Sequence, residues 1–344
     1  MTTHMAREIR EQPEAVARTI QALRSSGGEI RRLVGDRRHV LLVGRGTSDN
    51  AAVYGQYVLS CRGRLATLAS PSLATAYHAE LDLTDVVAVA VSQSGDTAEI
   101  VETLDWAARC GARTVAVTNN SESALAAMAD LALVTQAGPE VAVPATKTYT
   151  TQLAAMAVLG LSIAEDTEML EQLERVPEEM ARALASAAVM ERAAAGLIDA
   201  DRFVVAARGY ASSVAREIAL KLQETCYIAA VGLSYADLLH GPIAMVGEGT
   251  PTALIASSRD AAVLPGMVEV ARLCASASSD VIGIGGDEEF ASACHLSVPG
   301  PDSDAMLAPI SLVVPGQLLV EALARAKGID PDAPRGLRKV TQST

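Results

Sequence analysis

The segment Ser92–Thr97, which reads Ser-Gln-Ser-Gly-Asp-Thr, has the residue types of an anion-binding loop. Its three hydroxyl groups can donate hydrogen bonds, and Gly95 lets the backbone approach a ligand closely. An apolar run over residues 86–91 precedes the loop and a helical pattern follows it, so N–H groups of a helix start should face the same ligand. The loop is therefore predicted to bind a phosphate. The alternative is an ordinary helix cap with turn residues around it.

A second loop with hydroxyl side chains, Gly44–Ser48, follows the apolar run 39–43. Asp49 stands where a dinucleotide-binding loop would have its third glycine, and the lysine of a nucleotide phosphate loop is missing. These differences weaken the case for a nicotinamide or ATP site, and the two hydroxyls of the loop fit a compact ligand better. Taken alone, the loop would also suit a simple helix cap.

Charged residues with helical spacing lie in the second half of the chain. Glu217, Lys221 and Glu224 fall at i, i+4 and i+7 within an expected helix over residues 213–227. Their neighbours are apolar, so the charged side chains could line a pocket, and the alternative is a surface salt bridge. His240 follows on a Leu-His-Gly-Pro turn, where it could act as an acid or a base, although a single histidine is more often structural.

Apolar runs that alternate with helical patterns must position these side chains. The runs span residues 39–43, 86–91, 114–117, 131–134, 201–206, 253–255 and 281–284. Continuous β-branched runs separated by helices predict parallel sheets covered on both faces. Arg45 and Arg208 follow the first run of each half, 163 residues apart (208 − 45), and two later elements recur at a similar offset. This recurrence predicts a duplicated α/β unit.

The composition argues against several classes of protein. The 344 residues include 28 Lys and Arg and 41 Asp and Glu, and the net charge of −13 argues against nucleic acid or an anionic membrane as main partner. Five cysteines without CxxC spacing predict neither a disulfide framework nor a metal site, and we interpret them as small buried residues. With a charged N-terminus and no apolar run near about 18 residues, the chain is expected to be cytoplasmic.

Several features together resemble the sugar isomerase (SIS) family. They are the Ser92–Thr97 loop, the duplicated sheet, the segments Leu220–Glu224 and Leu239–Pro242, and the ending Pro334–Thr341. The likeness is to the isomerase half of glucosamine-6-phosphate synthase and to the glucosamine-6-phosphate deaminases built on that half, and it covers nearly the whole chain. It implies an α/β fold with two tandem SIS domains, each a parallel five-stranded doubly wound (flavodoxin-like) sheet flanked by helices.

The resemblance also implies domain bounds and binding residues. We expect an N-terminal helix and first SIS domain over residues 1–160, a helical connector over 161–194, a second domain over 195–328 and a tail over 329–344. The side chains implied to bind the sugar phosphate are Ser92, Gln93, Ser94 and Thr97. The residues implied to lie near the sugar are Thr47, Ser48 and Val143. At three positions this chain differs from the family pattern that the resemblance implies. It has Ala145 in place of a serine, Arg45 in place of a cysteine and Gln223 in place of a lysine. These differences affect the expected sugar contacts rather than the phosphate site.

Catalytic roles are implied in the second half of the chain. By resemblance, Glu224 carries a proton between C1 and C2 of an open sugar, and Lys221, oriented by Glu217, lies beside it. His240 would open the sugar ring and would be supplied by the neighbouring subunit of a homodimer. These are the groups that moving a proton between adjacent sugar carbons requires.

The tail is implied to carry one more catalytic residue. Lys339 would form a Schiff base with the open ketose, for which its amine must lose a proton. Burial or a cationic neighbour such as Arg335, Arg338 or Lys221 would favour that loss. Without the resemblance, Lys339 would be interpreted as a solvated tail charge.

These roles predict a phosphosugar aldose–ketose isomerase and deaminase that needs no metal and no cofactor. The chain begins Met1-Thr2-Thr3, without the N-terminal cysteine domain that releases ammonia from glutamine in the synthase. The expected reaction is therefore glucosamine 6-phosphate to fructose 6-phosphate and ammonia. The alternatives are a fructosamine-phosphate deglycase, another phosphosugar isomerase, or a non-catalytic phosphosugar-binding regulator, although such regulators usually carry a DNA-binding segment.

Overall fold

The computed structural model describes residues 2–339, which form two compact units. The N-terminal unit comprises residues 14–140, 147–174 and the tail from 338, and the C-terminal unit comprises residues 2–13, 141–146 and 175–337. The last residues of the expected SIS-like ending, Val340 and Thr341, lie outside the described part of the chain.

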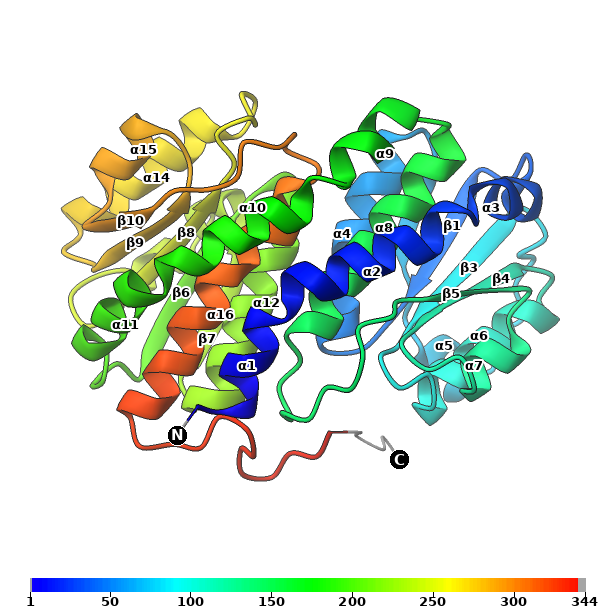
Figure 1. The fold of residues 1–344 in the computed structure, drawn as a ribbon, viewed down its shortest axis with the longest axis horizontal. Coiled ribbons are helices and arrows are strands. Elements are labelled where there is room, and N and C mark those ends of the chain that lie inside the picture. Colours follow the sequence, from blue (N-terminus) through cyan, green and yellow to red (C-terminus); the bar gives the residue numbers. More distant parts are fainter. Residues whose placement is uncertain (1, 340–344) are drawn as a thin grey trace. The chain divides into compact units, whose positions relative to one another are not determined.

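The N-terminal unit is built on a sheet of five parallel strands in the order β2-β1-β3-β4-β5. The strands are β1 (His39–Val43), β2 (Leu65–Leu68), β3 (Val86–Val91), β4 (Arg113–Thr118) and β5 (Leu131–Val134). One face is covered by α4 (Thr47–Cys61) and α8 (Lys147–Ala164), and the other by α5 (Ser72–Thr75), α6 (Ala98–Arg109) and α7 (Ala124–Met128) (Figure 1). Most of α2 (Gln12–Arg24), α3 (Gly27–Val34) and α9 (Thr167–Leu173) complete the unit.

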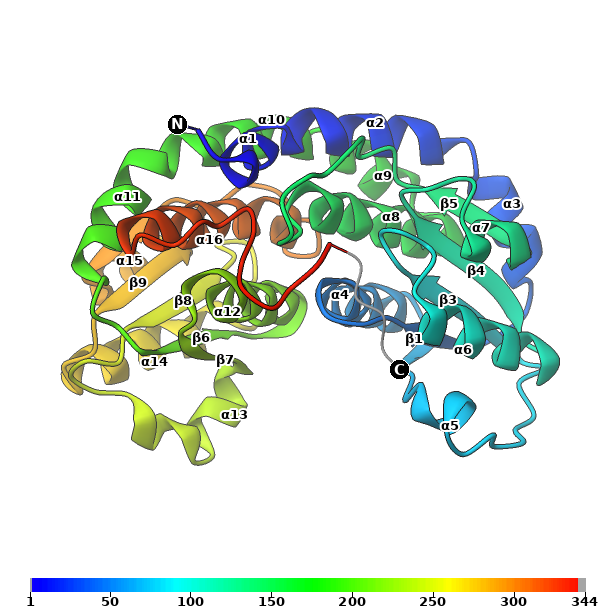
Figure 2. The ribbon, with the colours of Figure 1, turned by 90° about the horizontal axis from the view of Figure 1, so that it is seen from below.

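The C-terminal unit repeats this plan in the order β10-β9-β8-β6-β7, again with parallel strands throughout. Its strands are β6 (Arg202–Ala207), β7 (Ala229–Ser234), β8 (Thr252–Ala256), β9 (Val281–Gly285) and β10 (Leu296–Val298). Figure 2 shows α12 (Ser212–Cys226) and α16 (Ala308–Ala326) on one face and α14 (Leu264–Ser276) on the other. The remaining helices are α1 (His4–Arg10), α10 (Val176–Ala183), α11 (Ala187–Gly196), α13 (Tyr235–Leu239) and α15 (Glu288–Ala293), with 3-10 turns η1 (Leu184–Ser186), η2 (Gly209–Ala211) and η3 (Pro242–Met245).

Mostly aliphatic residues fill the cores of both units. In the N-terminal unit, Ala88 and Ala90 of β3 pack with Ile100 and Leu104 of α6. In the C-terminal unit, strands β6 and β8 pack against α14 through a matching layer of buried Val, Leu, Met and Cys side chains. The two equivalent strand orders confirm the predicted duplicated flavodoxin-like fold.

All seven predicted apolar runs are strands, and three further strands were missed: β2, β7 and β10. The segment 161–194, expected to be a helical connector, contains the end of α8, all of α9 and α10, and most of α11. Pro177 lies in the first turn of α10, where proline is tolerated. The interpretation of the cysteines as buried is wrong for Cys61, which is exposed. It holds for Cys226, where burial raises the thiol pKa to about 11.

The expectation that no apolar segment is long enough to span a membrane needs correction. Helix α16 has 19 residues with a mean hydropathy of 1.2, and within the described chain it alone meets the length and composition of a membrane span. Because 94% of that stretch is buried, α16 has the character of a core helix of its unit.

Candidate functional site

The Ser92–Thr97 loop joins the end of β3 to the start of α6 and is wound tightly around buried Ser92. Ser92 Oγ accepts a hydrogen bond from the Gly95 N–H at 3.2 Å and lies 3.5 Å from Thr97 Oγ1. Ser94 Oγ accepts from the Asp96 N–H at 3.3 Å. The carbonyl of Gln93 accepts from the Asn119 N–H at 3.1 Å, which ties the loop to the end of β4. All four predicted phosphate-binding residues therefore lie in one compact turn.

Gly95 and Thr97 give this loop features that a plain helix cap does not need. Gly95 has a φ of +72°, and a Cβ there would lie 2.2 Å from Ser123 Oγ, so the turn accepts only glycine. Thr97 is the N-cap residue of α6, yet its side chain makes no capping hydrogen bond. Its hydroxyl lies toward Ser92 instead, beside the open start of a 12-residue helix. This geometry favours an anion-binding loop over a simple cap.

The loop after β1 lies beside the Ser92–Thr97 loop, because β1 and β3 are neighbouring strands. Thr47 and Ser48 occupy the first turn of α4, and Ser48 Oγ accepts a hydrogen bond from Gln152 Nε2 of α8 at 3.0 Å. Arg45 makes two parallel hydrogen bonds to Glu99 in the first turn of α6, each of 2.7 Å. A direct contact therefore links the predicted sugar-binding loop to the first turn of α6, the helix that follows the predicted phosphate loop.

Helix α12 carries the predicted acid–base residues of the C-terminal unit. It is packed closely against α16, because a Cβ at Gly316 would lie 2.1 Å from Ile218 Cδ1. This close approach buries the face of α12 that holds Glu217 and Lys221, whose side chains are 0% and 1% exposed. The helix ends at Tyr227, whose left-handed backbone (φ +57°) turns the chain toward β7.

Lys221 lies between two carboxylates on this buried face. Its Nζ is 3.4 Å from Glu217 Oε1 and 2.5 Å from Glu224 Oε2. Burial works to lower the pKa of Lys221, but attraction and hydrogen bonds from both carboxylates outweigh it, and the pKa is raised above the ordinary 10.5. The three residues are therefore a buried ion-pair cluster, and the surface salt bridge considered from the sequence is excluded. Glu224, with 23% of its side chain exposed, is the member that reaches solvent.

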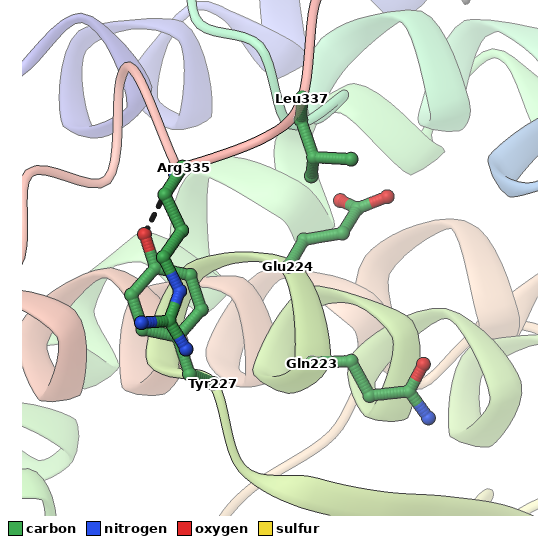
Figure 3. A pocket seen from close by; sticks show the side chains of 5 residues that line it. All are labelled: Gln223, Glu224, Tyr227, Arg335 and Leu337. Carbon is green, nitrogen blue, oxygen red and sulfur yellow. Dashed lines mark hydrogen bonds between the residues drawn. The ribbon is translucent and has the colours of Figure 1, made fainter.

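A pocket of about 270 Å³ opens at this exposed carboxylate. Its lining residues are Gln223, Glu224, Tyr227, Arg335 and Leu337. The Arg335 guanidinium lies over the Tyr227 ring, 4.3 Å from its centroid, and the Arg335 N–H donates to Tyr227 Oη at 2.8 Å (Figure 3). Figure 3 also shows the Leu337 side chain beside the Glu224 carboxylate, so the start of the tail forms one wall of the pocket.

Lys339 reaches a buried carboxylate of the N-terminal unit. Its Nζ donates to Glu140 Oε2 at 2.6 Å, and Glu140 also accepts from the Thr148 hydroxyl at 2.7 Å and the Thr148 N–H at 3.1 Å. Only a quarter of the Lys339 side chain is exposed, so it is not a solvated tail charge. Burial or a cationic neighbour was expected to favour loss of its proton; the side chain is largely buried, whereas the neighbour that the structure shows is an anion. Arg335, one of the cations considered, instead stacks on Tyr227.

Two predicted site residues of the C-terminal unit, His240 and Val143, are not among the residues that line the Glu224 pocket. His240 is exposed at the end of α13. The N–H of Val143 donates to the Asp332 carbonyl at 3.0 Å. The Asp332 carboxylate in turn accepts from the N–H groups of His4 and Met5, at 2.7 Å each, so α1 anchors this part of the tail.

Glu140 and Tyr227 were missed as site residues by sequence reasoning. Glu140 follows Gly-Pro in the sequence, and a single carboxylate in a loop carries no spacing signal. Tyr227 was assigned only as the end of a helix, because its contact depends on Arg335, which lies 108 residues away. Among the described residues, no group of three or more His, Cys, Asp or Glu side chains is placed to hold a metal ion.

A family model of the SIS domain matches residues 33–162 and 196–324, and the chain therefore belongs to the SIS domain family. The glutamine–fructose-6-phosphate aminotransferase (isomerizing) of Thermococcus kodakarensis is 34% identical over 346 residues, which cover 97% of this chain and 57% of that protein. The chain thus spans little more than half the length of that relative. These matches confirm the predicted family.

Two solved structures extend the comparison over nearly the whole chain. The C-terminal domain of glucosamine–fructose-6-phosphate aminotransferase from Francisella tularensis has a TM-score of 0.90 at 27% identity, covering 97% of this chain and 99% of that one. A Silicibacter pomeroyi protein provisionally named a phosphosugar isomerase has a TM-score of 0.86 at 35% identity, covering 96% and 100%. Both agree with the predicted pair of doubly wound sheets.

Proposed function

We propose that this protein is a phosphosugar aldose–ketose isomerase whose reaction is the deamination of glucosamine 6-phosphate. The observation that carries the proposal is the buried Lys221 between Glu217 and Glu224. Lys221 holds one oxygen of Glu224 by an ion pair, and the Glu224 carboxylate remains open to a pocket. A fixed carboxylate at a pocket is the group needed to move a proton between adjacent sugar carbons. The names of the T. kodakarensis and S. pomeroyi relatives support the same class of reaction.

The substrate phosphate is assigned to the Ser92–Thr97 loop. The loop offers hydroxyl groups at Ser92, Ser94 and Thr97 together with the start of α6. Helix-start N–H groups and hydroxyls bind a phosphate without a large net positive charge, which fits a chain with a net charge of −13. Thr47 and Ser48, in the neighbouring loop, are assigned to the sugar, as is Val143.

The proposed chemistry distributes three proton-transfer roles. His240 opens the sugar ring by moving a proton from the C1 hydroxyl to the ring oxygen. Glu224 then takes the proton from C2 and returns it to C1. In the same step the C1 oxygen gains a proton and the C2 nitrogen loses one, so the C1 aldehyde and C2 amine become a C1 hydroxymethyl group and a C2 imine. Lys339 gives a proton to Glu140 Oε2, its partner at 2.6 Å, and attacks C2 to displace ammonia. Water hydrolyses the Lys339 imine and releases fructose 6-phosphate.

Deamination is favoured over amination because water is its only co-reactant. The groups it needs, an acid–base carboxylate, an amine nucleophile with a proton acceptor and a phosphate loop, are all among the described residues. The proposal includes a cytoplasmic homodimer in which the partner supplies His240. The exposure of His240, beside Leu239 and Met245 that are each 42% exposed, supports such an interface.

The test is to incubate purified protein with glucosamine 6-phosphate and measure ammonia and fructose 6-phosphate. Glu224→Gln and Lys339→Ala should each lose at least about two orders of magnitude in kcat while melting near the wild-type temperature. Glu269→Gln, a change at an exposed carboxylate of α14, serves as the matched control and should keep full activity.

Four outcomes would each overturn the proposal or one part of it. Turnover of a fructosamine phosphate but not of glucosamine 6-phosphate would replace the substrate and keep the mechanism. No turnover of any phosphosugar, with phosphosugars still raising the melting temperature, would identify a binding protein instead. Near-wild-type rates for both variants would refute the residue assignment. A monomer by light scattering would refute the homodimer.

A further inference from the structure

The Arg45–Glu99 pair joins two loops to which the proposed function assigns different parts of one ligand. Arg45 belongs to the loop that carries Thr47 and Ser48, and Glu99 lies in the first turn of the helix that begins at the Ser92–Thr97 loop. The guanidinium donates from Nε to Glu99 Oε2 and from Nη2 to Oε1, both at 2.7 Å. Two parallel hydrogen bonds between planar groups fix both distance and orientation. The pair is therefore built to hold the two loops in one relative position.

The pair also controls charge at the start of α6. Asp96 and Glu99 are both acidic and lie within or next to the loop assigned to a phosphate, and Asp49 starts the neighbouring helix. An uncompensated carboxylate at this position would repel a phosphate. The hydrogen bonds from Arg45 lower the pKa of Glu99, so Glu99 stays ionised and its charge is offset by Arg45. Glu99 is 17% exposed and Arg45 53% exposed, so the ion pair lies at the edge of the loop.

We propose that Arg45 is a positioning and specificity-determining residue: it sets the spacing between the phosphate loop and the sugar loop and offsets the Glu99 charge. This inference rests on the proposed phosphosugar function. The role assigned to Arg45 is indirect and includes no contact with the reacting atoms: the Nε and Nη2 edge of its guanidinium binds Glu99.

The two effects of Arg45 can be separated by ligand choice. Inorganic phosphate fills only the Ser92–Thr97 loop, so its affinity reports the charge at α6. Fructose 6-phosphate must fit both loops, so its affinity reports the charge and the spacing together. Arg45→Lys keeps the charge and loses the bidentate geometry, whereas Arg45→Ala loses both.

The experiment is calorimetric titration of both ligands into wild type and the Arg45 variants, with melting curves for folding. Arg45→Ala should weaken inorganic phosphate by about fivefold and fructose 6-phosphate by about tenfold or more. Arg45→Lys should leave phosphate within about twofold and still weaken fructose 6-phosphate. Adding Glu99→Gln to Arg45→Ala should restore phosphate binding but not fructose 6-phosphate binding. The matched control, Arg109→Ala, breaks the exposed Arg109–Asp105 pair on the same helix and should change neither affinity.

Each result decides one question. If Arg45→Ala and Arg109→Ala bind fructose 6-phosphate equally well, the inference is overturned while the proposed function stands. If Arg45→Lys matches wild type for both ligands, only the spacing role is overturned and the charge role stands. If folded wild type binds neither ligand, the proposed function fails at the phosphate loop, and the inference fails with it.

Discussion

Replacing Lys221 by methionine tests whether the buried cluster on α12 holds Glu224 in place. Methionine has a similar length and no charge, so the change removes the ammonium and little volume. Glu217, which is fully buried, and Glu224 would then share an apolar helix face without the cation that lies 3.4 Å and 2.5 Å from them. Removing one partner of a buried ion pair costs about 3–5 kcal/mol of folding free energy. We expect a loss of that size for Lys221→Met.

The assay is urea-induced unfolding near neutral pH, followed by circular dichroism. Arg272→Met is the matched control: Arg272, on α14 of the same unit, also contacts two carboxylates, Glu269 and Glu289, but it is half exposed. An exposed pair contributes at most about 1 kcal/mol, so the control should unfold near the wild-type midpoint. A double variant, Glu217→Leu with Lys221→Met, should recover part of the stability, because it also removes the buried Glu217 carboxylate.

The pH dependence has a definite sign. The pKa of Lys221 is raised by folding, so its stabilising contribution is fully present below the ordinary value of 10.5 and disappears as pH rises through the raised value. The gap in stability between wild type and Lys221→Met should therefore be constant from neutral pH to about 10 and shrink above it. A cost for Lys221→Met no larger than that of Arg272→Met would refute the buried-cluster argument. A gap that widened with alkaline pH would refute the sign of the pKa shift.

Three further predictions concern the neighbouring groups. Glu224→Gln keeps the shape of the pocket and one acceptor for Lys221, so kcat should fall by about 10²-fold or more with a nearly unchanged KM, as steady-state kinetics would show. The Arg45–Glu99 pair stabilises the fold above the ordinary Glu99 pKa of 4.5, and this effect is lost as the pH falls below that value. The difference in unfolding free energy between wild type and Glu99→Gln, at most about 1 kcal/mol, should therefore vanish on acidification. A difference that grows on acidification would contradict this prediction. Tyr227→Phe removes the 2.8 Å hydrogen bond from the Arg335 N–H and keeps the ring under the guanidinium. Limited proteolysis should therefore cut the tail of this variant faster than that of the wild type. Equal cleavage rates would show that the hydroxyl does not hold the tail.

Central strands could be predicted from the sequence because both of their faces are buried. Strand β3, for example, is an unbroken Val and Ala run, and every residue of 87–91 is buried. The missed strands lack this signal. Strands β2 and β10 lie at the edges of their sheets and have four and three residues, too short to show a period. Strand β7 contains Gly232, where a Cβ would lie 2.6 Å from the Arg216 Cα of α12, and glycine within a run reads as a break.

The candidate site was predictable where its residues lie close together in the chain. The Ser92–Thr97 loop and the spacing of Glu217, Lys221 and Glu224 are local patterns, and the structure places each set in one turn or on one helix face. The partner of Lys339 was not predictable, because Glu140 lies 199 residues away and comes into contact only through the fold. The Arg45–Glu99 pair was missed for the same reason, since it depends on β1 and β3 being neighbours.

The hydrogen bonds of Asp332 connect the start of α1 both to the tail and to Val143. Its carboxylate accepts the first N–H groups of α1, while its carbonyl accepts the Val143 N–H. Exchange of the Val143 amide with deuterium therefore becomes a spectroscopic reporter on whether α1 is folded. An affinity tag or a preceding segment that strains residues 3–5 should speed up exchange of the Val143 amide before it disturbs the sheet. Measuring this exchange therefore checks an N-terminal fusion before its kinetics are interpreted.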